Sequence, residues 1–225
     1  MNVRRMVKEA LQKGSYEEIA LAYKDAPAEV LRNLQMHVYG GAHDTIRWYA
    51  IDFLGRLAQE HVETDKEAFR NIIRRFIWQM CEESANVPWA APEVCLSIIA
   101  RTGTIFYEFI GPVFYHAGLN EICHAGLFWG LSQLDDQGFE RAKEFLPDTL
   151  DRLQSPDIYA HDDFHWVLGF GCYLFAKKGY APAIPYLEKY KEQEEEIIVY
   201  DKGTFTSYTI KELVEEAIQE GKLAI

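Results

Sequence analysis

The stretch IRWYAIDFLGRL, residues 46–57, decides how the rest of the sequence is interpreted, because three later segments align with it without gaps. These are VPWAAPEVCLSI (87–98), ICHAGLFWGLSQ (122–133) and DFHWVLGFGCYL (163–174). Their first residues lie 41, 35 and 41 positions apart, close to the period of about 40 residues that helix-pair repeats show. The sequence therefore predicts four repeated helices, each the inner member of an antiparallel pair.

The residues between these segments predict the outer helix of each pair. Breaks rich in Gly, Pro, Thr and Asp separate helical patterns at 28–38, 67–80, 105–116 and 138–153. Within each inner helix, positions 1, 5, 8 and 12 share one face, and they are apolar in nearly every repeat. Position 5 is small in three repeats, as Ala50, Ala91 and Gly126, so we expect the helices to approach closely there.

The C-terminal part departs from this pattern. An acidic run at 186–196 is followed by β-branched and aromatic residues at 197–200 and 204–209, on either side of Asp201, Lys202 and Gly203. This pattern predicts a β-hairpin, and a helix is expected at 210–219. We therefore predict an all-α fold, a right-handed α-solenoid over residues 1–190. A hairpin and helix at 191–225 would cap its last apolar face.

Composition and charge narrow the functional classes. The chain has 225 residues, of which 48% are hydrophobic and 14% aromatic, which excludes a disordered protein. Its net charge of −12 argues against nucleic-acid binding, which depends on Lys and Arg. The four cysteines match no zinc or redox spacing, and residues 164–176 are too few for a membrane span. No signal peptide is evident, so we expect a cytoplasmic protein without a membrane partner.

Several segments resemble a known repeat family. The stretches DTIRWYAIDFLGRLA (44–58) and LFWGLSQL (127–134) resemble HEAT-like repeats of the variety found in phycobilin-lyase-type proteins. The stretch WQMCEESANVPWAAPE (78–93) resembles an uncharacterised bacterial family of lyase-related HEAT proteins. The resemblance implies an α-solenoid over about residues 28–176. Bilin lyases of this kind act on a phycobiliprotein, so the resemblance also raises the possibility of tetrapyrrole handling.

The candidate site comes from two other positions of the repeat, on the side of each helix away from the apolar face. Positions 3 and 7 supply aromatic, imidazole and carboxylate groups, namely Trp48, Asp52, Trp89, Glu93, His124 and His165. In one interpretation these side chains line a concave binding groove, the usual binding surface of a solenoid. In the other they pack between neighbouring helices. The second is favoured by helices that are apolar nearly all round.

Other polar clusters give weaker signals. Glu82, Glu83 and Glu121 could form the polar edge of a groove. The spacing Glu121-x-x-His124 is typical of carboxylate-bridged dimetal helices, but such sites use the motif twice and this sequence has it once. We therefore expect no metal and assign no catalytic residue.

The sequence favours a non-catalytic scaffold whose acidic, aromatic groove binds a protein partner of basic character. One alternative is a lyase or chaperone for a tetrapyrrole, which would be held by Trp stacking and His contacts. A DNA-base repair enzyme is a further alternative, but the charge of −12 counts against it.

Overall fold

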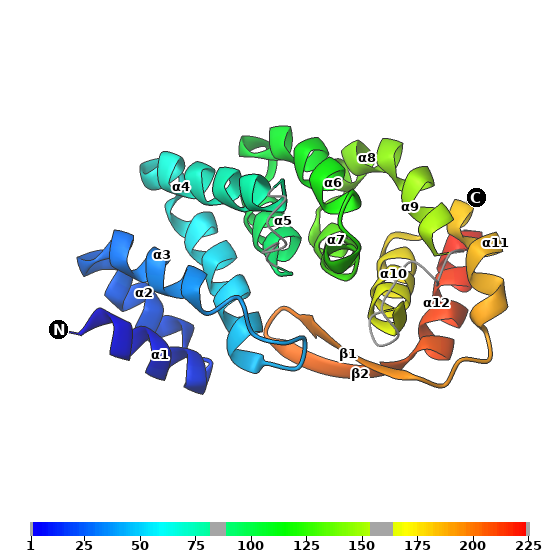
Figure 1. The fold of residues 1–225 in the computed structure, drawn as a ribbon, viewed down its shortest axis with the longest axis horizontal. Helices are drawn as coiled ribbons and strands as arrows, with labels where there is room; N and C mark the ends of the chain where they lie inside the picture. Colours follow the sequence, from blue (N-terminus) through cyan, green and yellow to red (C-terminus); the bar gives the residue numbers. More distant parts are fainter. Residues whose placement is uncertain (1, 82–88, 154–163, 224–225) are drawn as a thin grey trace.

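The computed structural model describes residues 2–81, 89–153 and 164–223, which are mostly helical (Figure 1). Three short helices open the chain: α1 (Val3–Lys13), α2 (Tyr16–Asp25) and α3 (Pro27–Met36). The long helix α4 (Thr45–Met80) follows. Its backbone leaves the helical region at Asp65, where φ is −117°, so α4 consists of two helices joined at a kink.

The remaining elements are shorter, and several are linked by single 3₁₀ turns. They are α5 (Ala91–Thr102), α6 (Ile110–Gly118), α7 (His124–Gln133), α8 (Asp136–Ala142), α9 (Leu146–Arg152), α10 (Phe164–Lys178), α11 (Ile184–Leu187), β1 (Glu196–Asp201), β2 (Thr204–Thr209) and α12 (Ile210–Leu223). The helical prediction is thus confirmed for the first half of α4 and for α10. It is only partly right for the other two inner helices, because Trp89 and Ala90 form a turn before α5, and a 3₁₀ turn at Glu121–Cys123 precedes α7. Val87, Pro88 and Asp163, at the starts of two predicted helices, lie outside the described residues.

The predicted outer helices are less regular than expected. The one at 105–116 begins as two 3₁₀ turns and becomes α-helical only in α6. The one at 138–153 is divided into α8 and α9 by a 3₁₀ turn, and Pro147 lies in the first turn of α9. Proline is tolerated there because the first turn has no backbone donor to lose, whereas it would interrupt a continuous helix.

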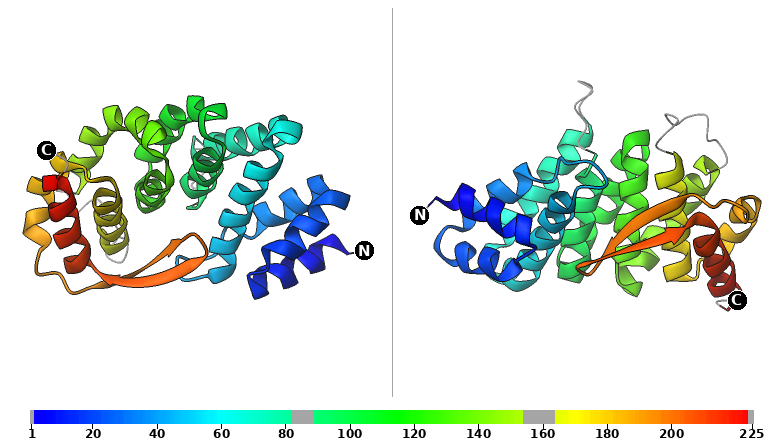
Figure 2. Two further views of the ribbon diagram at one scale, coloured as in Figure 1. Left: turned by 180° about the vertical axis from the view of Figure 1, so that it is seen from behind. Right: turned by 90° about the horizontal axis from the view of Figure 1, so that it is seen from below.

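The helices form two layers. The first half of α4 packs beside α5, α5 beside α7, and α7 beside α10, while the second half of α4, α6 and α8 lie on their outer side (Figures 1 and 2). The inner helices α4 and α5 run in the same direction, because Arg47 contacts Glu93 and Asp52 contacts Arg101. Equivalent helices of successive helix pairs are expected to be parallel in this way.

Glycines allow the inner helices to approach closely. A Cβ atom on Gly55 of α4 would lie 2.5 Å from Oγ of Ser97 and 2.8 Å from Cδ of Arg101, both on α5. A Cβ on Gly130 of α7 would lie 2.5 Å from Cδ1 of Leu96. Contacts this short require a neighbouring side chain or helix to shift. The inner helices therefore approach closely at Gly55 and Gly130, which are not at repeat position 5, where the alignment predicted close approach.

We expect Gly55→Ala to lower the free energy of unfolding by about 1–3 kcal/mol, the usual cost of forcing atoms into a packed interior. Gly41→Ala is the control, because nothing lies within 4 Å of a Cβ atom at that position. Urea denaturation of both variants measures the difference. Equal stabilities of the two variants would contradict the close approach of α4 and α5.

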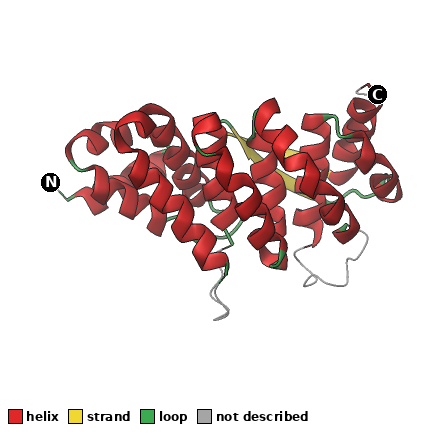
Figure 3. Cartoon of the chain, turned by 90° about the horizontal axis from the view of Figure 1, so that it is seen from above, coloured by secondary structure: helices red, strands yellow, loops and turns green. Residues whose placement is uncertain are grey.

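The C-terminal hairpin is confirmed, and it crosses the inner layer. β1 and β2 are antiparallel, and the two-residue turn Lys202–Gly203 joins them. Ile197 and Val199 are buried while Ile198 is 40% exposed, so one face of β1 packs on the helices. Figure 3 shows the strands lying behind the helices in the view from above. The final helix, α12, runs through Gly221 to Leu223 rather than ending at 219.

Candidate functional site

The hairpin covers part of the face that the sequence suggested as an open groove. Trp48 is 1% exposed, its ring is stacked 5.8 Å from that of Tyr200, and its Nε1 donates a hydrogen bond to the carbonyl oxygen of Ala42 at 2.8 Å. The ring of Trp129 also lies 4.9 Å from that of Trp48, and its Nε1 donates to the carbonyl oxygen of Tyr200 at 2.6 Å. Trp48 is therefore a core residue that anchors the hairpin.

Asp52 and His124 are buried as well. Asp52 is 5% exposed and forms an ion pair with Arg101. Burial raises the pKa of the Asp52 carboxyl, and the charge of Arg101 opposes that change. His124 is 2% exposed, and its Nε2 lies 3.2 Å from the carbonyl oxygen of Gly118. The side chains at position 3 thus do not share one open face: Trp48 and His124 pack between helices, as the second interpretation expected, whereas Trp89 is exposed.

Four other predicted residues, Trp89, Glu93, Glu121 and His165, come together in a pocket of about 420 Å³ between α4, α5, α7 and α10, which we call the indole pocket. The aromatic, imidazole and carboxylate side chains that line it include His43, Trp89, Glu93, Glu121, His165 and Trp166. Trp89 is 62% exposed, so this indole lies open to solvent at the pocket wall. Four of the nine sequence-predicted site residues therefore share one cavity.

A buried ion pair forms one wall of the indole pocket. Arg47 of α4 contacts Glu93 of α5, and both side chains are at least nine-tenths buried. Glu93 lies directly against Gly126, where a Cβ atom would collide with the carboxylate. Among the described residues, Oε2 of Glu93 and Nε of Arg47 are buried without a hydrogen-bond partner. Burial raises the pKa of the Glu93 carboxyl, and Arg47 opposes the shift.

Aromatic rings form another part of the wall. The ring of Trp166 lies 5.1 Å from those of His43 and His165 and 5.6 Å from that of Phe170. Such ring clusters provide a flat apolar surface with electron-rich faces, which attract cations. The carboxylate of Glu121, an exposed residue, adds a negative charge, and it forms no ion pair with another described residue. The pocket thus combines apolar walls with one excess negative charge.

Sequence reasoning missed Arg47, His43 and Trp166 as wall residues. Arg47 could have been found, because a charged residue inside an otherwise apolar helix needs a partner when it is buried. The same reasoning applies to Asp52 and Glu93, which pair with Arg101 and Arg47 across the α4–α5 contact. Two basic and two acidic residues in apolar helices therefore signal ion pairs between those helices.

Further features considered in the sequence are two more carboxylates, metal ligands, a membrane span and the cysteines. Glu82 and Glu83 lie outside the described residues. In the described part of the chain, no group of three or more His, Cys, Asp or Glu side chains could hold a metal, and no helix is long and apolar enough to cross a membrane. The buried thiols of Cys95, Cys123 and Cys172 have raised pKa values because burial disfavours the thiolate.

The geometry described above is the only basis for the candidate site. Comparison with known proteins finds no matching family model, no matching curated protein and no matching solved structure. The similarity to phycobilin-lyase-type HEAT proteins stays a prediction from the sequence.

Proposed function

We propose that this chain is a non-catalytic binding module, built as a HEAT-like α-solenoid, that engages a basic segment of a protein partner. In this proposal the indole pocket takes up one lysine or arginine side chain of the partner. The parallel inner helices and the two-layered arrangement support the repeat architecture. The observation that carries the function is the pocket itself, in which the rings of Trp89 and Trp166 line the same cavity as Glu121.

The chemistry of the pocket favours a cation on an apolar stem. A lysine or arginine side chain has a hydrophobic stem that packs against indole rings and a charged end that interacts with their faces. The Arg47–Glu93 pair has no net charge, so Glu121 determines the sign of the pocket. The overall charge of −12 would also accelerate the encounter with a basic partner.

The test uses short peptides that differ only in one central residue: lysine, arginine, glutamine or glutamate. We expect the two basic peptides to bind more tightly than the glutamine peptide, and the glutamate peptide to show no binding. Glu121→Gln should weaken the basic peptides by about 3–10-fold, which corresponds to about 1 kcal/mol of interaction at an exposed site. Isothermal titration calorimetry measures each affinity.

The matched control is Glu17→Gln, since Glu17 is exposed on α2 and does not line the pocket. Both variants remove one negative charge, so a general electrostatic effect would weaken binding equally in both. Equal affinities for lysine and glutamine peptides would overturn the proposal. The same conclusion would follow if Glu17→Gln weakened binding as strongly as Glu121→Gln.

One observation favours tetrapyrrole handling as a second candidate. His43 and His165 flank the ring of Trp166, so the pocket offers two imidazoles beside a flat aromatic wall. When haemin or a linear bilin is added to the wild-type protein, the visible absorption spectrum of the pigment should then change. The change should be lost in Trp166→Leu, whose folding is checked by circular dichroism. An unchanged spectrum with both pigments would remove this candidate.

A further inference from the structure

A second cavity lies where the tip of the hairpin meets α4, α5 and α7. It has a volume of about 290 Å³ and shares no wall residue with the indole pocket. We call it the hairpin pocket, and its polar walls include Asp52, Gln59, Arg101, Gln133, Tyr200 and Lys202. Of these side chains, Asp52 and Tyr200 are more than nine-tenths buried. The cavity is thus a polar site lined by three helices and by the hairpin, at whose tip Lys202 is exposed.

The charge of the hairpin pocket is opposite to that of the whole chain. Arg101 is neutralised by its ion pair with Asp52. Lys202 forms no ion pair with any side chain in the described ranges 2–81, 89–153 and 164–223. The walls therefore carry one excess positive charge in a protein of net charge −12. The amides of Gln59 and Gln133 add neutral hydrogen-bond donors.

The backbone at Lys202 indicates that its side chain has a role beyond the turn. Lys202 has a φ of 48° and Gly203 a φ of 90°, as in the tight hairpin turns that favour Asn-Gly. A left-handed conformation costs about 1 kcal/mol for a residue such as lysine, and less for asparagine. Lysine is therefore a poor choice for the turn itself, and what it adds at this position is an ammonium group beside a cavity.

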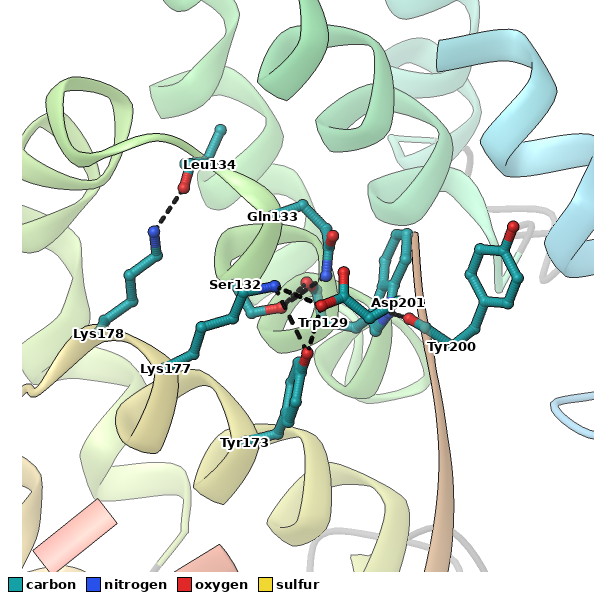
Figure 4. A network of polar contacts seen from close by, with 9 residues as sticks. All are labelled: Trp129, Ser132, Gln133, Leu134, Tyr173, Lys177, Lys178, Tyr200 and Asp201. Atoms are coloured by element: carbon teal, nitrogen blue, oxygen red, sulfur yellow. Dashed lines mark hydrogen bonds and ion pairs between the residues drawn. The ribbon is translucent and has the colours of Figure 1, made fainter. Parts of the chain in front are cut away.

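The residues just before Lys202 are held by contacts with α7 and α10, which anchor the strand end next to it. Trp129 anchors Tyr200 through the hydrogen bond described above, at 2.6 Å. Tyr173 donates to Oδ2 of Asp201 at 2.9 Å, and Nζ of Lys177 lies 3.0 Å from the same oxygen (Figure 4). Asp201 is thus engaged on the α10 side, and the neighbouring Lys202 extends from an anchored strand end.

We propose that the hairpin pocket binds a small anion of the carboxylate or phosphate class, with its charge between the Lys202 ammonium and the Arg101 guanidinium. Charge-assisted hydrogen bonds from both groups would hold the anion, and the amides of Gln59 and Gln133 would complete its coordination. The cavity volume fits a small metabolite-sized anion rather than a polymer. This inference does not depend on the function proposed for the indole pocket.

The test titrates inorganic phosphate and malonate into the wild type and Lys202→Asn at constant ionic strength, with chloride as the balancing anion. Asparagine suits the left-handed turn, so Lys202→Asn should be at least as stable as the wild type. We expect saturable binding of phosphate or malonate to the wild type. Lys202→Asn should weaken it at least tenfold. A gain in stability with a loss of binding separates a ligand role from a structural one.

Lys24→Asn is the matched control, because Lys24 is exposed on α2 and lines neither pocket. It should bind both anions as the wild type does. Two outcomes would overturn the inference: neither phosphate nor malonate binds the wild type saturably, or Lys202→Asn binds as tightly as Lys24→Asn. Binding of phosphate alone would indicate a phosphate ester, and binding of malonate alone would indicate a carboxylate.

Discussion

Replacing Trp48 by alanine is expected to lower the free energy of unfolding by about 3–5 kcal/mol, the range found for truncating a large buried aromatic residue. The indole fills space between Trp129, Phe170 and Tyr200, and its Nε1 is hydrogen-bonded to the chain before α4. Truncation would remove these contacts and leave a cavity beneath the hairpin. Urea denaturation followed by circular dichroism measures the loss.

Trp89→Ala provides the comparison within the same repeat position. Trp89 is 62% exposed, so its truncation should change the stability by no more than about 0.5 kcal/mol. Trp48→Ala should also increase hydrogen exchange of the β1 and β2 amides, because the hairpin would lose its contact with α4. Similar stabilities for the two variants would contradict the assignment of Trp48 to the core and Trp89 to the pocket wall.

Removal of Arg47 is the second change with a large expected effect. Arg47→Met would leave the Glu93 carboxylate buried without its partner, and such uncompensated charges cost about 3–5 kcal/mol of stability. Methionine keeps the length of the apolar stem, so the lost charge is the main change. The double variant Arg47→Met/Glu93→Gln should recover a large part of the stability, because a neutral amide is less costly to bury than a carboxylate.

The cost of Arg47→Met should also depend on pH. Burial already raises the pKa of Glu93, and loss of the arginine would raise it further. Below the unfolded-state value of about 4.3, Glu93 is protonated in both states and the variant is least affected. As the pH rises from there through the pKa that Glu93 has in the folded variant, the stability of Arg47→Met relative to the wild type should fall. A cost that is the same at pH 4 and pH 8 would contradict this account.

The sequence predicted the helices well because their determinants are local. Periodic apolar residues and the 41-35-41 spacing located the inner helices, and the β-branched run before Lys202 located the hairpin. The alternation of buried Ile197, exposed Ile198 and buried Val199 even shows that β1 has one packed face. Which surface that face covers depends on contacts between residues far apart in the sequence, and no local pattern encodes them.

The candidate site was predictable only in part, for the same reason. The repeat alignment treats Trp48 and Trp89 as equivalent, yet the hairpin covers only Trp48. Residues at the same repeat position can therefore have different neighbours. The alignment does not indicate Trp166, because Trp166 stands one place after repeat position 3, which His165 occupies. The charges of Arg47, Asp52 and Glu93 within apolar helices carried information that the alignment of apolar positions did not use.

The central claim, that the indole pocket receives a cationic side chain, is tested most directly by the indole N–H signals of Trp89 and Trp166. A ¹H–¹⁵N correlation spectrum resolves them from the signals of Trp48 and Trp129, which are buried under the hairpin and serve as internal controls. On titration with the lysine or arginine peptide, we predict that the Trp89 and Trp166 signals shift in a saturable manner while the Trp48 and Trp129 signals stay in place. Unchanged Trp89 and Trp166 signals, or equal shifts with the glutamine peptide, would contradict the claim.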